Sequence, residues 1–502
     1  MPAIATQTTT TRIKAFAANN PAMLFVLCYF AFQVFFLTMI SNGAGVDDAE
    51  QLAYVGALQW GYGGSQAPLY TWINSIAGDF LGISLFTIYL VKFSMLASLF
   101  ASVYFGARLL GLSRMVAAAG MLGMFMLPQI SWESQRTLTH SVGGTTGCAW
   151  AFLAFAWHMK SRSWLSAALL GLGIAAGLLG KFNASFLLIA LILAGFSIPN
   201  YRSVLLSRPS LAAVLAFAAA VTPTGLWALA HTENLLARSH KFEMNAGGQL
   251  FISRLHGEWK LFLNSVLFSG VALAFFGIAW WRGRGDRVTA RSSWTDGEKL
   301  VARIVWFALA CVAIGVLISG AAEVKDRWLQ PILFLSPLYL AVLLDRFIRS
   351  DVPLKRFAVV GAICGLIAIP GLAINMLYAR DGDTPSIGQL DYAKLFAVTR
   401  ADGDYRTVVS DGPQFPGNLR LYDTSLSPVH IEMPNASARI KFPALFVWSG
   451  NDLNPAVMAL MNAAGIATPP PTDVRHISLG FKHYPERTEG VSYVLVPGPA
   501  KP

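Results

Sequence analysis

Long runs of apolar residues, separated by short polar segments, recur along the chain as far as Tyr378. A helix needs roughly 17 to 25 such residues to cross about 30 Å of hydrocarbon. Eleven runs approach or reach this length, and they lie near residues 22–40, 84–105, 114–130, 141–158, 164–180, 182–198, 209–230, 261–281, 302–320, 328–345 and 357–378. The pattern therefore predicts a polytopic α-helical membrane protein with about eleven spans, a count that three short runs leave open by two.

The pattern changes after Tyr378 and stays mixed to the end of the chain. Short β-type runs, TVVS, ALFVW and SYVLV, alternate there with the helix-like segment NPAVMALMNAAG. Strand runs that alternate with helical patterns are typical of an α/β module. We expect a transmembrane domain at 1–378, which includes an outer loop at 41–83, and a soluble α/β domain at 379–502.

The positions of Lys and Arg predict the orientation of the spans. Arg12 and Lys14 precede the first run, and further clusters follow each even-numbered run. Because cytoplasmic loops are enriched in Lys and Arg, this places the N-terminus in the cytoplasm and the C-terminal domain outside. The first run lacks a cleavage signal and is predicted to stay as an uncleaved helix.

Composition narrows the classes of function. With 55% hydrophobic and 13% charged residues, the chain departs from the average soluble protein. Its net charge of +11 is divided among many loops, so no continuous basic face for nucleic acid is indicated. The four cysteines show neither metal-ligand spacing nor a disulfide pattern.

The first outer loop holds the main candidates for chemistry. The segment from Asn42 to Trp72 contains Asp47, Asp48 and Glu50 but no Lys or Arg. A carboxylate beside water can remove a proton from an acceptor hydroxyl, although a solvated loop explains the acids equally well. The segment from Gln66 to Trp72 adds Tyr70 and Trp72, which suit either sugar stacking or an interfacial aromatic belt.

Several cations lie on the predicted outer face, against the charge bias of the chain. Lys181, Lys325 and Arg327 suggest binding of an anion such as a phosphate. Alternatively, Lys181 extends to the lipid headgroups, and Asp326 neutralises the charge of Lys325 or Arg327. Three further outer residues, Arg136, His140 and Arg238, are candidates for substrate contact, with solvated charge as the default interpretation. Lys92, inside the second run, is expected to reach the interface or to pair with a carboxylate.

These motifs resemble the GT-C class of polyprenyl-phosphate-sugar-dependent glycosyltransferases, which includes protein O-mannosyltransferases and the lipid A aminoarabinose transferase. The similar segments are Asp47-Asp48, QAPLYTW at 66–72, GLLGKFN at 177–183 and DRWLQP at 326–331. The segments DDAE at 47–50 and QAPLYTW at 66–72 are most similar to those of the rhizobial-type branch that adds galacturonic acid to lipopolysaccharide core or lipid A. Three features depart from the pattern: Asp48 replaces a usual Glu, Gln66 replaces a leading Lys, and the loop is short.

The resemblance implies an inverting transfer from a polyprenyl-phosphate-linked sugar to a lipid-anchored glycan acceptor in the bilayer. It also implies that the membrane is a bacterial inner membrane, with the C-terminal domain in the periplasm. By the resemblance, Asp47 deprotonates the acceptor and Asp48 supports it, while Lys181, Arg327 and Lys325 hold the donor phosphate. The remaining candidates for substrate contact are Glu50, Gln66, Tyr70, Trp72, Arg136, His140 and Arg238. No cofactor is required and no metal ligand is assigned, although a divalent cation stays open. A transporter or flippase of lipid-linked sugars is the alternative, and the single acidic loop and the soluble domain favour the enzyme.

Overall fold

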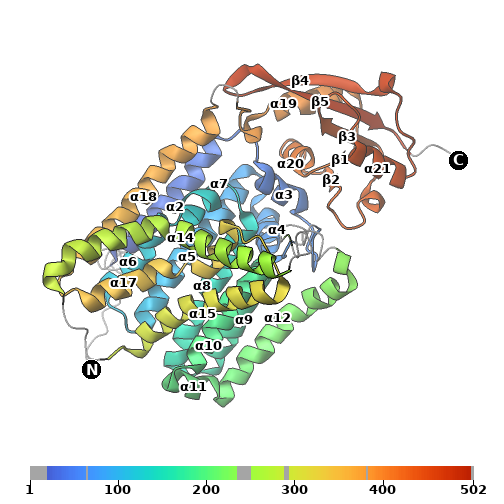
Figure 1. The fold of residues 1–502 in the computed structure, drawn as a ribbon. Coiled ribbons are helices and arrows are strands. Elements are labelled where there is room, and N and C mark those ends of the chain that lie inside the picture. Colours follow the sequence, from blue (N-terminus) through green and yellow to red (C-terminus); the bar gives the residue numbers. More distant parts are fainter. Residues whose placement is uncertain are drawn as a thin grey trace, which may run out of the picture.

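The computed structural model describes residues 20–63, 66–233, 243, 250–287, 293–379 and 383–498. A bundle of helices makes up most of it, and a mixed β-sheet lies at one end of the bundle (Figure 1). We call this end the sheet side and the other end the opposite side. Arg12, Lys14 and Arg238 lie outside the described residues.

Every predicted apolar run is helical in the structure. The long helices are α2 (Pro21–Ile40), α5 (Leu85–Leu109), α8 (Thr139–Ser161), α9 (Trp164–Gly180), α12 (Leu211–Ala230), α14 (Leu250–Arg282), α15 (Asp296–Ser319) and α18 (Val352–Leu377), together with α16 (Gln330–Leu333) and α17 (Ser336–Phe347). Within the described residues, seven helices are long and apolar enough to cross a membrane, or nine if two bent pairs each count as one span. The other two predicted runs are α8, which is rich in Gly and Thr, and α9, which has only 17 residues. The predicted class, a polytopic helical membrane protein, is confirmed.

Two of the predicted runs meet a sharp bend, the third within its predicted bounds and the sixth at its end. The third divides into α6 (Arg114–Gly123) and η1 (Met124–Met126), followed by η2 (Gln129–Glu133) and α7 (Ser134–Arg136) after a bend of 72°. The sixth, predicted at 182–198, is formed by η3 (Phe182–Ala184) and α10 (Ser185–Phe196), and a bend of 110° at its end leads into α11 (Pro199–Leu205). In both cases the residue before a proline, Leu127 or Ile198, is extended. A proline disfavours helical geometry in the residue before it, which explains both breaks.

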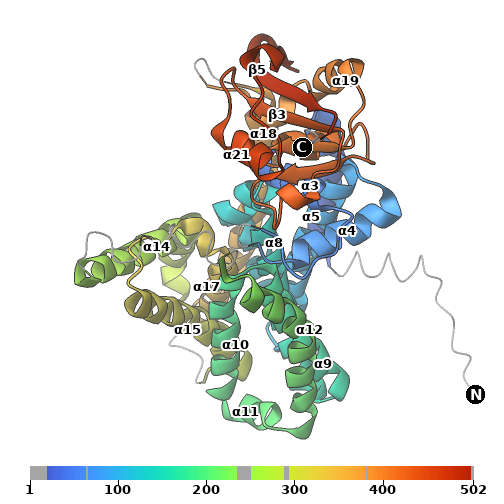
Figure 2. The ribbon, with the colours of Figure 1, turned by 90° about the vertical axis from the view of Figure 1, so that its right-hand side faces the viewer.

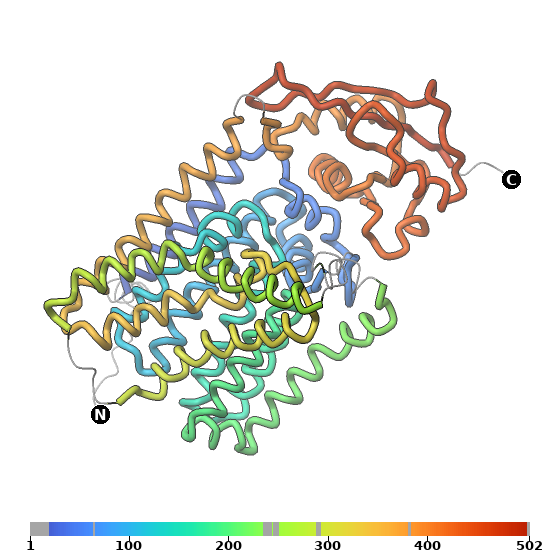
Figure 3. Tube along the Cα trace, in the orientation of Figure 1, coloured from blue at the N-terminus to red at the C-terminus, as the bar shows by residue number. Residues whose placement is uncertain are grey.

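The two ends of the helical part meet in space. Helices α2 and α18, which begin and end this part of the chain, lie side by side, as the Cα trace in Figure 3 shows. Helix α14 begins at Leu250, so residues 250–260, predicted as part of a loop, continue this helix.

Small residues allow α8 and α9 to touch along their backbones. A Cβ added to Gly147 would lie 2.4 Å from the carbonyl carbon of Ala176, and one added to Gly180 would lie 2.5 Å from that of Gly143. Small residues at helix interfaces permit this approach in membrane proteins. The contact places the residue after α9, Lys181, beside the beginning of α8.

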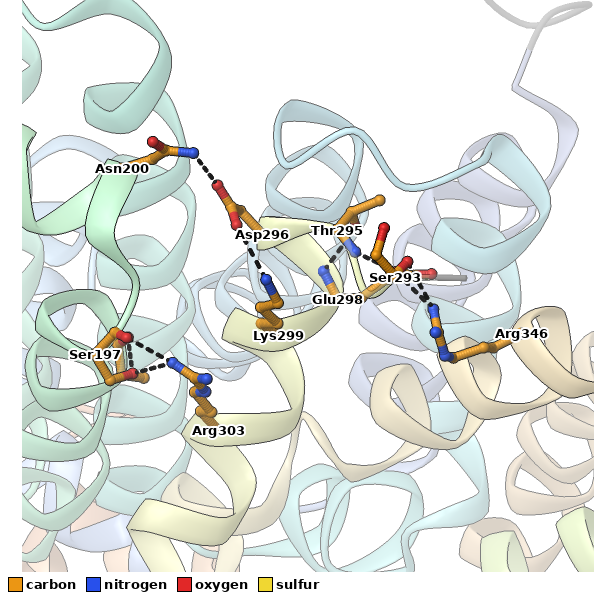
Figure 4. A network of polar contacts seen from close by, with 10 residues as sticks. Ser197, Asn200, Ser293, Thr295, Asp296, Glu298, Lys299, Arg303 and Arg346 are labelled. Carbon is orange, nitrogen blue, oxygen red and sulfur yellow. Dashed lines mark hydrogen bonds and ion pairs between the residues drawn. The ribbon is translucent and has the colours of Figure 1, made fainter. Parts of the chain in front are cut away.

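Polar side chains join several helices on the opposite side (Figure 4). Asn200 donates to Asp296 at 2.6 Å, and Arg303 donates to the backbone oxygen and to the hydroxyl of Ser197, both at 2.7 Å. Arg346 pairs with buried Glu298 at 3.3 Å. The contacts show that segments predicted to share one face of the membrane do meet at one end of the bundle.

The C-terminal segment forms a five-stranded sheet with the order β2-β1-β3-β5-β4. The strands are β1 (Thr407–Ser410), β2 (Ser427–His430), β3 (Ala444–Ser449), β4 (Arg475–Phe481) and β5 (Tyr484–Val496), and the helices are α19 (Tyr392–Asp402), α20 (Gln414–Leu419) and α21 (Pro455–Ala463). Strand β1 is parallel to β2 and β3, whereas β5 is antiparallel to β3 and β4. The three predicted β-type runs and the predicted helix coincide with β1, β3, β5 and α21.

Candidate functional site

The first loop folds into two helices beneath the sheet, α3 (Val46–Tyr54) and α4 (Leu69–Leu81), as Figure 2 shows. Asp47 and Asp48 occupy the first turn of α3. Carboxylates are favourable there because unpaired backbone N–H groups make a helix N-terminus partly positive. Ala49 and Leu52 are fully buried on the same helix. The acidic segment is therefore an ordered helix rather than a solvated loop.

Asp48 is buried against the second membrane helix. Its two carboxylate oxygens each lie 2.7 Å from the Nζ of Lys92, and the side chains are 3% and 0% exposed. This confirms the prediction that Lys92 can pair with a carboxylate. Burial raises the pKa of Asp48, and the Lys92 ammonium opposes that shift. Asp48 therefore joins α3 to α5 and faces away from solvent.

Asp47, next in sequence, has a different environment. It is partly exposed, and its Oδ2 accepts a hydrogen bond of 2.8 Å from the backbone N–H of Leu138. Leu138 has a φ of 57°, the left-handed region, which is rare for a bulky side chain and is found preferentially at functional sites. In the described part of the chain no second donor contacts the Asp47 carboxylate, so its other oxygen is available to accept a proton.

Lys181 lies near Asp47, and a second cation, Arg327, lies near Lys181. The Nζ of Lys181 donates to the hydroxyl of Ser141 at 2.6 Å. Burial and the positive charge of Arg327 lower the pKa of Lys181 to about 8, and the charge of Asp47 acts in the opposite direction. Among the described residues, neither Lys181 nor Arg327 forms an ion pair with a carboxylate. The fold therefore gathers one partly exposed acid and two cations that have no acidic partner, an arrangement suited to an anion.

The third predicted phosphate ligand lies in the same turn as Arg327. The ammonium of Lys325 is 6.0 Å from the centre of the Trp328 ring. The neighbouring Asp326 accepts hydrogen bonds from the side chain of Gln129 at 2.5 Å and from the backbone of Arg327 at 2.7 Å. Asp326 is thus bound to an amide and does not form an ion pair with either neighbouring cation.

A second polar cluster surrounds Glu50. Its Oε2 lies 3.4 Å from the Nε2 of His140, and its Oε1 accepts a hydrogen bond of 3.3 Å from Gln66. Gln51, fully buried, lies 3.4 Å from the same nitrogen of His140 and accepts from Thr71 at 2.9 Å. The structure therefore brings together three of the predicted residues, and adds Gln51, which the sequence interpretation did not select.

The predicted aromatic residues lie on α4. Tyr70 is fully buried, and burial together with the charges of Asp48 and Asp47 raises its pKa well above the ordinary value. Trp72 donates to the backbone oxygen of Gln59 at 2.7 Å and packs edge-on against Trp60. Their contact with a sugar stays a prediction.

The remaining predicted residue among the described ones, Arg136, pairs with an acid outside the first loop. Arg136 is exposed and pairs with Glu133 at 2.9 Å. The sequence interpretation missed two site residues, Leu138 and Ser141. Leu138 contributes its backbone N–H and Ser141 a hydroxyl group of a common residue type, so neither side chain could be recognised from the sequence as part of a site. Within the described residues no group of three or more His, Cys, Asp and Glu side chains lies close enough to hold a metal ion.

Comparison with known proteins gives relatives over nearly the whole chain. No family model matches the sequence. Lipopolysaccharide core galacturonosyltransferase RgtB of Rhizobium johnstonii (strain DSM 114642 / LMG 32736 / 3841) is 27% identical over 454 residues, which cover 88% of this chain and 90% of the relative. Lipopolysaccharide core galacturonosyltransferase RgtA of the same organism is 26% identical over 481 residues, which cover 90% and 93%.

Solved structures share the fold. ArnT from Cupriavidus metallidurans bound to undecaprenyl phosphate superposes with a TM-score of 0.56 and 12% identity, and the match covers 94% of this chain and 97% of ArnT. The same protein in its apo state gives a TM-score of 0.52 and 14% identity, with 95% and 98% covered. At this level of identity the likeness establishes a common architecture of helices and C-terminal domain.

Proposed function

We propose that this chain, a glycosyltransferase of the GT-C class, transfers galacturonic acid from a polyprenyl-phosphate donor to a lipopolysaccharide core or lipid A acceptor. The names of the two curated relatives support the sugar and the acceptor. The fold shared with a protein solved with undecaprenyl phosphate supports the donor. A transporter or flippase is not favoured, because both curated relatives are named as transferases.

One observation supports the mechanism above all others: Lys181 lies close to both Asp47 and Arg327, and within the described residues neither cation forms an ion pair with a carboxylate. Asp47 keeps one oxygen free of hydrogen bonds from the described residues, whereas Asp48 uses both of its oxygens on Lys92. A general base must reach the proton that it removes. We therefore assign the base to Asp47 and give Asp48 a structural role.

The reaction then follows in one displacement. Asp47 accepts the proton of the acceptor hydroxyl, and the acceptor oxygen attacks the anomeric carbon of the donor sugar. The bond between this carbon and the phosphate oxygen breaks, and polyprenyl phosphate leaves with the bonding electrons. Lys181 and Arg327 stabilise the negative charge that develops on the phosphate, which lowers the barrier. A single in-line displacement inverts the anomeric configuration.

The other predicted residues are assigned to the substrates around this centre. We place Lys325 at the edge of the phosphate site, since it belongs to the same turn as Arg327. A polar cluster is formed by Glu50, Gln66 and His140, and we assign it to contact with sugar hydroxyls. Tyr70, Trp72 and Arg136 are assigned to the periphery of the substrates, and Arg238 keeps the role inferred from the sequence.

The proposal also assigns an orientation and a division of the chain. The chain crosses the membrane several times, and we place the sheet side in the periplasm of a bacterial inner membrane. The contacts of Arg303 and Arg346 on the opposite side support this, because basic residues favour the cytoplasmic face (Figure 4). On this view residues 1–378 form the membrane domain and residues 379–502 the periplasmic domain.

Mass spectrometry of lipid A and core oligosaccharide, from cells with and without the protein, tests the proposal. We expect one hexuronic acid to be missing without the protein, and to stay missing when only Asp47→Asn is supplied. Asp79→Asn is the matched control, because Asp79 is exposed at the far end of α4; it is expected to restore the sugar fully. Unchanged glycans with donor accumulating in the cytoplasmic leaflet would instead support a flippase.

A further inference from the structure

The helix that bears Asp47 is in contact with a short helix from the C-terminal domain. Helix α20 lies against α3 between the helical bundle and the sheet (Figure 1). Arg420 is the residue that follows α20. These two segments are separated by more than 350 positions in the sequence, as the contact between Arg420 and Leu52 illustrates. Four residues of the C-terminal segment contact α3 at its middle and its end and the chain just before it begins.

Arg420 binds the C-terminal end of α3. Its Nη1 donates to the backbone oxygens of Leu52 at 2.8 Å and Val55 at 2.7 Å. The last carbonyl groups of a helix have no partner within the helix and carry partial negative charge. Arg420 is only 8% exposed, so its guanidinium supplies hydrogen bonds and charge where water has little access.

Asn418 binds the chain just before α3 begins. Its Oδ1 accepts from the backbone N–H of Ala44 at 2.7 Å, and its Nδ2 lies 3.2 Å from the oxygen of the same residue. Gln414 donates to this oxygen as well, at 3.0 Å. In the middle, Gly417 touches the backbone of α3, since an added Cβ would lie 2.2 Å from the oxygen of Ala49.

A helix of nine residues needs such support. Isolated helices shorter than roughly 12–15 residues are marginal in water, so tertiary contacts decide where α3 lies. The side of α3 that faces the bundle is bound through Asp48 to Lys92 and through Asp47 to Leu138. Its other side is bound by α20, so α3 is held between the bundle and α20.

We propose that Arg420 and Asn418 are positioning residues for the transfer reaction: through α20, the C-terminal domain holds the general base at its working distance. This inference rests on the proposed function, since it takes Asp47 as the base. It gives the C-terminal domain a part in the chemical step itself. A displacement of about 1 Å at a catalytic group can reduce the rate by about 100-fold, so small movements of α3 are sufficient.

The test uses the full-length enzyme in nanodiscs with purified donor and acceptor. For Arg420→Ala we expect kcat to fall by roughly 10- to 100-fold with the donor KM nearly unchanged, since an interaction made only in the transition state is lost. Added methylguanidinium is expected to restore part of the kcat of Arg420→Ala and none of that of Asp47→Asn. Arg400→Ala is the matched control, because Arg400 pairs with Asp423 inside the C-terminal domain.

Three results would overturn the inference: a wild-type kcat in Arg420→Ala, an equal loss in Arg400→Ala, or a change confined to the donor KM. If Arg420→Ala does not fold, Asn418→Asp decides. This variant keeps the acceptor for the N–H of Ala44 but places a negative charge beside its oxygen, so a wild-type kcat would refute the proposal. Activity in Asp47→Asn would contradict the proposed function itself, whereas an inactive Asp47→Asn with a fully active Arg420→Ala would contradict the positioning role alone.

Discussion

Removing one partner of the Asp48–Lys92 pair is expected to destabilise the protein far more than removing both. The two side chains are 3% and 0% exposed and lie 2.7 Å apart. Lys92→Met leaves a buried carboxylate without a counter-charge, and Asp48→Asn leaves a buried ammonium. The double variant, Asp48→Asn with Lys92→Met, leaves neither charge.

The magnitude follows from the geometry. At 2.7 Å and an effective dielectric constant near 20, the attraction is about 6 kcal/mol. Desolvation of the two ions offsets much of it, so the intact pair adds little net stability. Breaking a buried pair from one side costs about 3–5 kcal/mol. This is a large part of the roughly 5–15 kcal/mol that stabilises a typical folded protein. We therefore expect each single variant to unfold at much lower temperature and the double variant to recover most of the loss.

The assay combines thermal unfolding in detergent with turnover per folded molecule. Recovery of both stability and turnover in the double variant would support a structural role for Asp48. A double variant that is as unstable as the singles would refute the reasoning about the pair. A stable but inactive double variant would show that Asp48 takes part in the chemistry, as the family resemblance implied.

Three further predictions concern other parts of the molecule. Because the pKa of Lys181 is lowered to about 8, its charge is lost as the pH rises above that value, and the donor KM should increase from pH 8 to 10 in the wild type but not in Lys181→Arg. In the same pH range the lysine of the unfolded chain still binds a proton whereas that of the folded chain does not, so the contribution of Lys181 to the free energy of unfolding should rise with pH. A donor KM that does not change with pH would contradict the phosphate role. Glu298→Gln, on the opposite side, should lower the unfolding temperature through Arg346 and leave turnover per folded molecule unchanged, and a specific loss of turnover would argue against a purely structural network. Gly180→Ala should raise the donor KM, because the added Cβ would lie 2.5 Å from Gly143 and displace Lys181. In the control Gly173→Ala, on the same helix interface, the added Cβ would lie 2.9 Å from Ala151, and only stability should change. Equal effects of the two variants on the donor KM would refute this local explanation.

Features that depend on local composition were predictable from the sequence. The apolar runs identify the membrane helices, because hydrocarbon thickness sets their length. The runs TVVS and ALFVW become β1 and β3, since β-branched and aromatic residues favour strands. The acidic first loop, the outer cations and the family resemblance pointed to the region where Lys181 lies near both Asp47 and Arg327.

The continuity of the spans was not predictable, because equivalent local signals have different outcomes. Pro223 and Pro370 lie inside the continuous helices α12 and α18, whereas Pro128 and Pro199 follow extended residues at sharp bends. Which prolines break a helix depends on whether neighbouring segments satisfy the freed backbone groups. That information lies in the packing of the bundle.

Tertiary structure also separated two acids that the sequence treats as equivalent. Asp47 and Asp48 are adjacent, and the helix turns them toward different neighbours, Leu138 and Lys92. The contact to Asp47 comes from a backbone N–H, which no side-chain pattern reveals. The contacts of Arg420 with α3 join distant parts of the chain through carbonyl groups. The sequence alone thus determined the membrane architecture and the chemical types present, whereas only the tertiary structure decided which of the two carboxylates is partly exposed, which is buried and what holds each of them, because these depend on contacts between distant segments.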